Sequence, residues 1–185
     1  RGALGLLARA VHDRLPDLVT VGVTGSSGKT TTKDLIAHIL RAHGSTVAPP
    51  GSLNNELGVP LTVFRCDDTT RFLVVEMGAR GLGHISYLCG IAPPQVGVVL
   101  NVGSAHVGEF GNQGTIAAAK SELVAALPST GIAVLNAEDP LVAAMREVTS
   151  AEVMTFGEYL PADVHVRDLT LDHLARPRFD LEFDG

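Results

Sequence analysis

The sequence has few cysteines, no cluster of basic residues and no long apolar run, and each scarcity excludes a class of protein. Cys66 and Cys89 are the only cysteines, so we expect small buried side chains in a reducing compartment rather than a disulfide framework or a metal cluster. Because the formal net charge is −6 and lysine and arginine do not cluster, we expect no nucleic-acid surface. No apolar run approaches the ~20 residues of a membrane span, and no signal peptide is visible, so we expect a cytoplasmic protein.

Short apolar strands alternate with segments of helical periodicity along the 185 residues. This alternation predicts an α/β fold, a three-layer sandwich whose mainly parallel sheet has helices on both faces. The predicted strands are 19–24, 72–76, 96–101, 132–136 and 153–156, and the predicted helices are 3–15, 33–42, 85–89, 116–127 and 141–148. Alternation without an intervening helix at 163–171 and 178–183 predicts an antiparallel β extension at an edge.

One glycine-rich turn, between the strand at 19–24 and the following helix, is the most informative stretch. The free amides and partial positive charge of a helix N-terminus suit phosphate oxygens. We therefore expect a P-loop, with Lys29 on the β- and γ-phosphates of a nucleotide and the Thr30 hydroxyl on Mg²⁺. The first glycine of G-x-x-x-x-G-K-[ST] would fall at Val23, and the plainer alternative is a tight turn with a solvated lysine. The residues expected to bind the nucleotide here are Thr24, Gly25, Ser26, Ser27, Gly28, Lys29, Thr30 and Thr31.

The helix expected over 33–42 has an apolar side and a polar side. Its apolar residues recur at helical spacing, and we expect this side to pack on the sheet. They are Leu35, Ile36, Ile39 and Leu40, whereas Asp34, His38 and Arg41 are left for solvent.

Polar side chains follow several of the predicted strands, at the edge of a parallel sheet where ligands gather. Glu76 is placed to hold the same Mg²⁺ as Thr30, with a surface carboxylate as the alternative. His106 is a candidate ligand for a second metal or else a solvated loop residue. Asn136 and Asp139 are candidates for hydrogen bonds to a base or ribose, although Asp139 fits equally well as a helix N-cap. Lys120 has the pattern of an ordinary exposed helix lysine.

Taken together, six segments resemble the ATP-dependent Mur ligases of bacterial cell-wall synthesis. They are TGSSGKTTTK at 24–33, LNNELGVP at 53–60, VEMGA at 75–79, NVGSAH at 101–106, AKSEL at 119–123 and LNAEDP at 135–140. Among the family, they are most similar to the ligase that joins D-alanyl-D-alanine to UDP-N-acetylmuramoyl-tripeptide through an acyl phosphate. The Ser-Ser P-loop and the Asn-Asn segment favour it over sister ligases and folylpolyglutamate synthetase, whose P-loops more usually carry Thr-Asn-Gly.

The resemblance implies roles that spacing alone does not show. Lys29 would bind phosphate, Thr30 and Glu76 the first magnesium, and His106 the second. The family's lysine at position 120 is commonly carbamylated, which makes it an anion that helps to hold the second magnesium and the γ-phosphate. That modification needs a neutral amine, so burial or a nearby cation must lower the lysine pKa.

The resemblance also implies which residues lie near adenine and near the substrate. Asn136 would lie near adenine, and we expect substrate contacts from Asn54, Asn55 and Ser104. Two positions depart from the family pattern: Glu138 stands where the family usually has Asp, and His84 where it more often has Glu.

Mur ligases have further domains on both sides of the ATPase domain, one holding the UDP-sugar and one closing over the nucleotide. We expect residues 1–185 to be the central ATPase domain, inactive alone and monomeric, with a leading helix (1–16), a nucleotide-binding core (17–157) and a β-rich edge (158–185). The alternatives are a different amide ligase of the same fold and a nucleotide-binding regulatory module.

Overall fold

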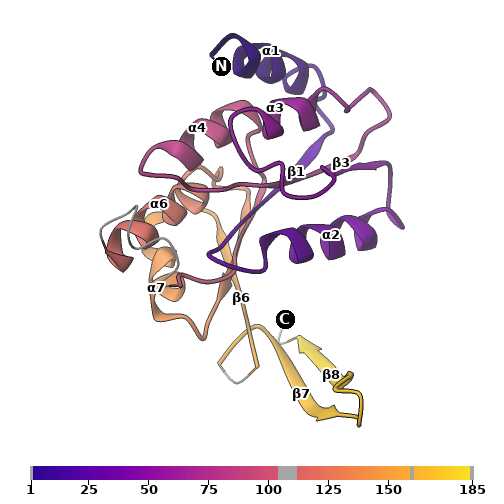
Figure 1. The fold of residues 1–185 in the computed structure, drawn as a ribbon, viewed down its shortest axis with the longest axis vertical. Helices are drawn as coiled ribbons and strands as arrows, with labels where there is room; N and C mark the ends of the chain where they lie inside the picture. Colours follow the sequence, from indigo (N-terminus) through magenta and orange to yellow (C-terminus); the bar gives the residue numbers. More distant parts are fainter. Residues whose placement is uncertain (1, 104–111, 159–160, 184–185) are drawn as a thin grey trace.

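In the computed structural model, residues 2–103, 112–158 and 161–183 are described, and they contain one eight-stranded sheet with helices on both faces (Figure 1). The strand order is β2-β3-β1-β4-β5-β6-β7-β8, and every pair is parallel except β7 and β8. The strands are β1 (Val19–Thr24), β2 (Thr46–Val47), β3 (Phe72–Glu76), β4 (Val96–Val99), β5 (Ile132–Asn136), β6 (Glu152–Gly157), β7 (Val164–Leu171) and β8 (Pro177–Phe183). The predicted α/β architecture is confirmed, including the antiparallel hairpin, which projects at the opposite end from α1 (Figure 1).

The helices agree with the predicted pattern but differ at their ends. They are α1 (Gly2–His12), α2 (Lys29–Leu40), α3 (Gly58–Val63), α4 (His84–Ile91), α6 (Gln113–Ala125) and α7 (Pro140–Ala143), which continues as the 3₁₀ helix η1 (Ala144–Val148). The sequence did not predict β2 or α3, because a two-residue strand and a six-residue helix carry too little periodicity. The strand predicted at 96–101 ends at Val99, and α2 begins four residues earlier than predicted.

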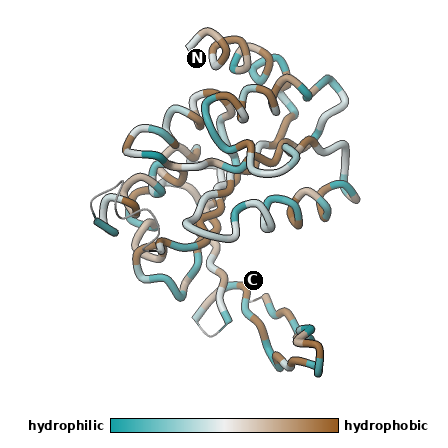
Figure 2. Tube along the Cα trace, viewed as in Figure 1, coloured by the Kyte–Doolittle hydropathy of each residue, from teal (hydrophilic) through white to brown (hydrophobic). Residues whose placement is uncertain are grey.

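The two faces of the sheet carry unequal cores. On one face, α2 packs with Ala37 against Val21 and Val23 of β1 and their neighbours. The larger core, on the opposite face, includes residues of α3, α4, α6 and α7. Brown, hydrophobic segments accordingly run through the sheet between these helices (Figure 2).

The predicted apolar side of α2 is partly wrong. Leu35 and Ile39 are 59% and 61% exposed, whereas Lys33 and Ala37 are fully buried. The small Ala37 side chain lets the helix approach the sheet, which brings Lys33, one turn earlier, into the interior as well. A count of apolar residues could not reveal this, because a buried lysine needs acceptors from elsewhere in the chain.

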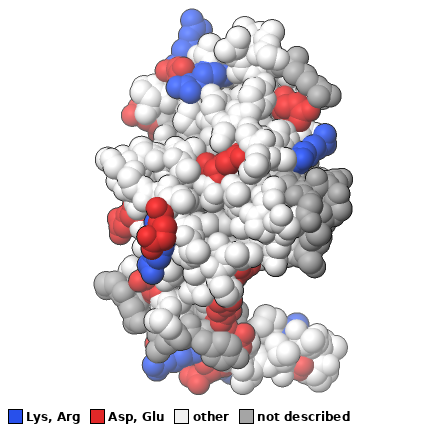
Figure 3. Space-filling view, turned by 90° about the vertical axis from the view of Figure 1, so that its left-hand side faces the viewer, with Lys and Arg blue, Asp and Glu red and all other residues white. Residues whose placement is uncertain are grey.

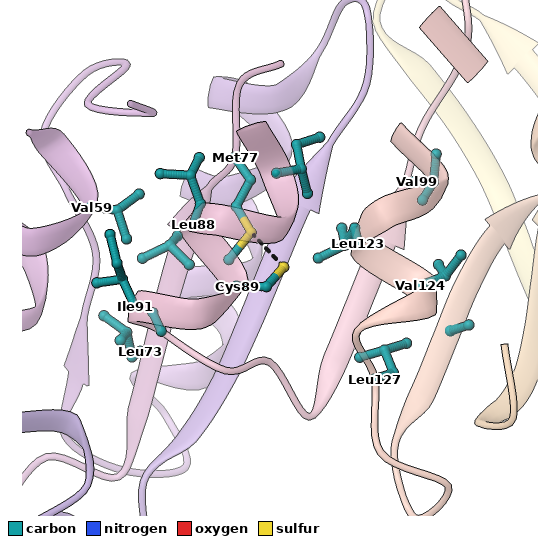
Figure 4. Close-up of a cluster of buried hydrophobic side chains, with 14 of the residues drawn as sticks. Val59, Leu73, Met77, Leu88, Cys89, Ile91, Val99, Leu123, Val124 and Leu127 are labelled. Carbon is teal, nitrogen blue, oxygen red and sulfur yellow. Dashed lines mark hydrogen bonds between the residues drawn. The ribbon is translucent and has the colours of Figure 1, made fainter. Parts of the chain in front are cut away.

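The close packing of α6 on the sheet depends on glycines in the strands. A Cβ added to Gly22 would lie 2.9 Å from the Leu123 side chain, and one added to Gly97 would lie 3.3 Å from it. Leu123 therefore fills the space that two missing side chains leave, within the cluster drawn in Figure 4.

Both cysteines are free and buried, as expected. Cys89 packs in the same cluster, with its Sγ 3.6 Å from the Met77 sulfur (Figure 4). Burial raises the pKa of its thiol to about 12 and that of Cys66 to about 11, so both stay protonated at neutral pH.

The face shown in Figure 3 carries scattered acidic and basic side chains rather than a broad basic patch. Within the described parts of the chain, no helix is long and apolar enough to span a membrane.

Leu123→Ala should lower the free energy of unfolding by about 2–5 kcal/mol, because the glycines beneath it cannot fill the cavity. Urea unfolding measures the change. Leu181→Ala is the matched control, since this leucine is 65% exposed and its truncation should cost no more than about 0.5 kcal/mol. Equal losses in the two variants would contradict this account of the core.

Candidate active site

The predicted P-loop joins β1 to α2, and its last glycine begins the helix. Gly28 has a φ of +80°, a conformation that residues with a Cβ rarely adopt, and it occupies the N-cap position of α2. Helix α2 starts at Lys29, so the amides of its first turn have no acceptor within the helix. The turn therefore has the backbone geometry that suits an anion.

Asn101 fixes the shape of this loop, and it was not among the predicted site residues. Its Oδ1 accepts hydrogen bonds from the backbone amides of Ser26 (2.9 Å) and Ser27 (3.0 Å). The Ser26 hydroxyl in turn accepts from the Gly103 amide at 2.9 Å. Because these two amides are already engaged, the donors best placed for phosphate lie at the start of α2. The signal was present in the sequence, since Asn101 is the polar residue that ends the apolar strand predicted at 96–101.

A buried carboxylate connects the P-loop helix to a distant loop. Glu76, at the end of β3, is only 1% exposed. Its Oε2 accepts a hydrogen bond from the Thr30 hydroxyl at 2.8 Å, and its Oε1 accepts one from the Asn54 amide nitrogen at 2.7 Å. The structure therefore brings together the two residues predicted to share a magnesium ion and adds Asn54 to them.

This set of oxygen atoms fits a magnesium site. Mg²⁺ prefers hard oxygen ligands and is usually held by one or two carboxylates together with phosphates and water. The Thr30 hydroxyl and the Glu76 carboxylate meet that description. No group of three or more His, Cys, Asp or Glu side chains suited to a metal occurs among the residues described.

Two lysines contribute to the electrostatics of the site. Lys29, four residues after Gly25, donates to that residue's carbonyl at 2.9 Å and so lies over the P-loop. Lys120 of α6 is only 5% exposed, contrary to the pattern of a surface lysine. Burial, assisted by the Lys29 charge, lowers the Lys120 pKa from 10.5 to about 8. An appreciable fraction of this amine is therefore neutral near physiological pH.

The other predicted nucleotide residues lie at the ends of β5 and α7. Asn136 donates to the Leu100 carbonyl at 2.9 Å and borders a cavity of about 320 Å³ that Glu138 and Phe156 also line. Asp139 is the N-cap of α7, and its carboxylate also accepts from the Val102 amide at 2.7 Å. The capping alternative thus describes what Asp139 does in the structure, and its contact with a nucleotide stays a prediction.

Several other candidates have structural partners. The Thr24 hydroxyl donates to the Met77 carbonyl at 2.9 Å, and the Asn55 side chain accepts from the amides of Leu57 and Gly58 at the start of α3. His84, one of the two departures from the family pattern, lies 3.3 Å from the Glu56 carboxylate. Ser104 and His106 lie outside the described residues.

Comparison with known proteins decides the family. Residues 23–178 match the Mur ligase middle domain. The chain belongs to the Mur ligase family. A curated Mycobacterium tuberculosis H37Rv protein, UDP-N-acetylmuramoyl-tripeptide--D-alanyl-D-alanine ligase, is 53% identical over 181 residues, which cover 97% of this chain and 36% of the relative. The chain therefore spans little more than a third of that relative's length.

Solved Mur ligase structures share the fold. A crystal structure of MurF from Acinetobacter baumannii has a TM-score of 0.92 and 36% identity, and the match covers 98% of this chain and 40% of that one. MurF from Thermotoga maritima in complex with ADP has a TM-score of 0.88 and 35% identity, with 99% and 42% covered. The expected resemblance to the D-alanyl-D-alanine-adding member of the Mur ligases is thus confirmed.

Lys120 should make stability depend on pH in a defined window. The Lys120 pKa is about 8 in the folded chain and 10.5 in the unfolded chain. Between these two pH values the unfolded chain holds the Lys120 proton and the folded chain has released it, so the free energy of unfolding rises with pH. Lys120→Met removes this contribution, so any advantage of the variant should shrink between about pH 7.5 and about pH 10. Urea unfolding in CO₂-free buffers tests this, and a pH-independent difference would contradict the lowered pKa.

Proposed function

We propose that this chain is the nucleotide-binding part of an ATP-dependent ligase that joins D-alanyl-D-alanine to UDP-N-acetylmuramoyl-tripeptide. The observation that carries the proposal is the hydrogen bond between Thr30 and Glu76 beside a P-loop. The lowered pKa of Lys120, to which the charge of Lys29 contributes, supports it. The names of the relatives supply the substrates, and the ADP complex of the Thermotoga maritima relative supports a nucleotide at this loop.

The proposed reaction has two steps. A carboxylate oxygen of the tripeptide attacks the γ-phosphorus of ATP, the bond to the β-phosphate oxygen breaks, and ADP leaves an acyl phosphate behind. The amine of D-alanyl-D-alanine then attacks the acyl carbon, and the tetrahedral intermediate loses a proton and expels phosphate. Both steps develop negative charge on phosphate oxygens, so catalysis depends mainly on positioning and electrostatic stabilisation.

The chain's own residues would supply that stabilisation. Lys29 would leave the Gly25 carbonyl to bind the β- and γ-phosphates, while the first amides of α2 bind further oxygens. Thr30 and Glu76 would hold Mg²⁺, which lowers the charge on the phosphates when bound. Asn54 and Asn101 keep the carboxylate and the loop in place.

A second magnesium would require further ligands. Carbamylation of Lys120 is part of the proposal, because a neutral amine attacks CO₂ at carbon and loses a proton to become a carbamate anion. The low exposure and lowered pKa of Lys120 support this chemistry. His106 is proposed as a further ligand, and Ser104 and Asn55 as substrate contacts.

The cavity beside Asn136 is proposed to receive the adenine ring. It has a volume of about 320 Å³ and lies between the ends of β5 and β6 and the β7–β8 hairpin. Phe156 and Val166 offer apolar surface, while Asn136 and Glu138 offer polar groups to the base or ribose.

The same fold would also serve a different amide ligase or a regulatory module that binds ATP. We further propose that the chain works as the central domain of a longer, cytoplasmic enzyme that does not complete ligation without its other domains. ADP release measured with each candidate acceptor separates the ligases. A response to ATP that needs no carboxylate substrate would favour the regulatory module.

Lys29→Ala in the full-length protein should lower ATP-dependent ligation by at least about 1,000-fold, because the β- and γ-phosphates lose the lysine proposed to bind them. Coupled measurement of ADP release and of the ligated product gives the rate. Arg41→Ala is the matched control, since it removes a cation at the other end of α2 and should change the rate by less than about two-fold. Near-normal turnover of Lys29→Ala would exclude the P-loop role.

Carbamylation predicts a distinct carbonyl signal when the protein is equilibrated with ¹³C-bicarbonate. We expect this ¹³C NMR signal in the wild type and none in Lys120→Arg, whose guanidinium does not form a stable carbamate at this pH. A wild-type spectrum without the signal would remove Lys120 from the proposed metal site.

A further inference from the structure

The chain contains only three lysines, and the proposed function uses two of them, Lys29 and Lys120. The third, Lys33, lies on α2 four residues after Lys29 and is fully buried. Burying an ammonium group is costly unless its N–H groups find acceptors. The burial of Lys33 therefore has to be explained by its contacts, which is not the case for a lysine at the surface.

Lys33 has an acceptor for each of its three N–H groups. Its Nζ donates to the Pro49 carbonyl at 2.6 Å and to the Gly51 carbonyl at 3.1 Å, and it lies 2.7 Å from the Asp34 carboxylate. Both carbonyls belong to residues 48–57, which contain no helix or strand and which we name the asparagine loop. Because regular secondary structure does not position this loop, individual contacts with other parts of the chain must do so.

The other end of the asparagine loop reaches the candidate magnesium site. Asn54 donates its side-chain amide to Glu76 at 2.7 Å, and its carbonyl accepts a hydrogen bond from the Gly78 amide at 2.9 Å. The loop packs tightly against the start of α3, since a Cβ added to Gly58 would lie 2.5 Å from the Leu53 carbonyl carbon. The backbone around Asn54 therefore has little room to shift. A displacement at Pro49 or Gly51 is therefore expected to reach Asn54.

We propose that Lys33 is a positioning residue for the phosphate and magnesium site. By binding the carbonyls of the asparagine loop, it holds Asn54 against Glu76, and Glu76 in turn against Thr30. Thr30 and Lys33 are three residues apart on α2, so the contacts form a closed circuit that begins and ends on one helix. The proposal rests on the proposed function for its catalytic consequence, but its structural part can be tested without any ligand.

Hydrogen exchange of the Gly78 amide tests the structural part. Lys33→Met keeps an unbranched side chain, one heavy atom shorter, and removes the charge and donors, so exchange at Gly78 should accelerate by at least about 10-fold while that of β4 is unchanged. Arg65→Met is the matched control: it removes a 2.9 Å contact to the Ala48 carbonyl in the same loop, and Gly78 exchange should stay within about two-fold. Unchanged exchange in Lys33→Met would overturn the proposal.

Magnesium dependence in the full-length protein tests the catalytic part. The Mg²⁺ concentration for half-maximal ADP formation should rise about 10–100-fold in both Lys33→Met and Asn54→Ala. The double variant should be no worse than the more affected single one, because both changes break one circuit. Lys33→Arg, which keeps the charge and donors, should recover part of the loss and serves the same comparison if Lys33→Met does not fold.

Two results would count against Lys33 as a positioning residue. One is a variant with lowered thermal stability but an unchanged Mg²⁺ midpoint, and the other is a double variant whose defects multiply. A failure of the proposed function looks different: the wild-type full-length protein would form no ADP with these substrates, while the Gly78 exchange result would still decide the structural part.

Discussion

The buried carboxylate of Glu76 is the constraint on which the rest of the site depends. A carboxyl group that is 1% exposed needs hydrogen-bond partners, and Thr30 and Asn54 supply them from elements far apart in the sequence. Satisfying this one group brings the start of α2 and the asparagine loop to the end of β3. The sheet places Glu76 there because β3 lies beside β1, the strand that leads into the P-loop.

Lysine burial sets the electrostatic character of the site. Lys29 stays partly exposed and accessible to an anion, whereas Lys33 is buried with acceptors for all its N–H groups. Lys120 is also buried, and the positive charge of Lys29 acts on it. Desolvation is the larger cause of the lowered Lys120 pKa, and repulsion by Lys29 adds to it. The three lysines therefore lie in three different environments, and each environment sets how exposed and how solvated the amine is.

Much of the fold could be predicted because the strands are short, apolar and separated by helical periodicity. The P-loop could be predicted too, since strand, glycine turn, Lys29 and helix are contiguous and their chemistry is local. Prediction was less successful where a side chain finds its partners at a distance. Leu35 and Ile39 were assigned to the core although they are exposed, and Asn101 was overlooked although it shapes the loop.

Neighbouring residues were enough to predict the alternation of the longer strands and helices, the position of the P-loop and the resemblance to a ligase family. The folded structure was needed to show that Lys33 and Lys120 are buried, that Asn54 donates to Glu76, and that α2 turns Lys33 and Ala37 toward the sheet. Burial and hydrogen bonding depend on atoms that the fold brings close from distant parts of the chain, so no local pattern reveals them.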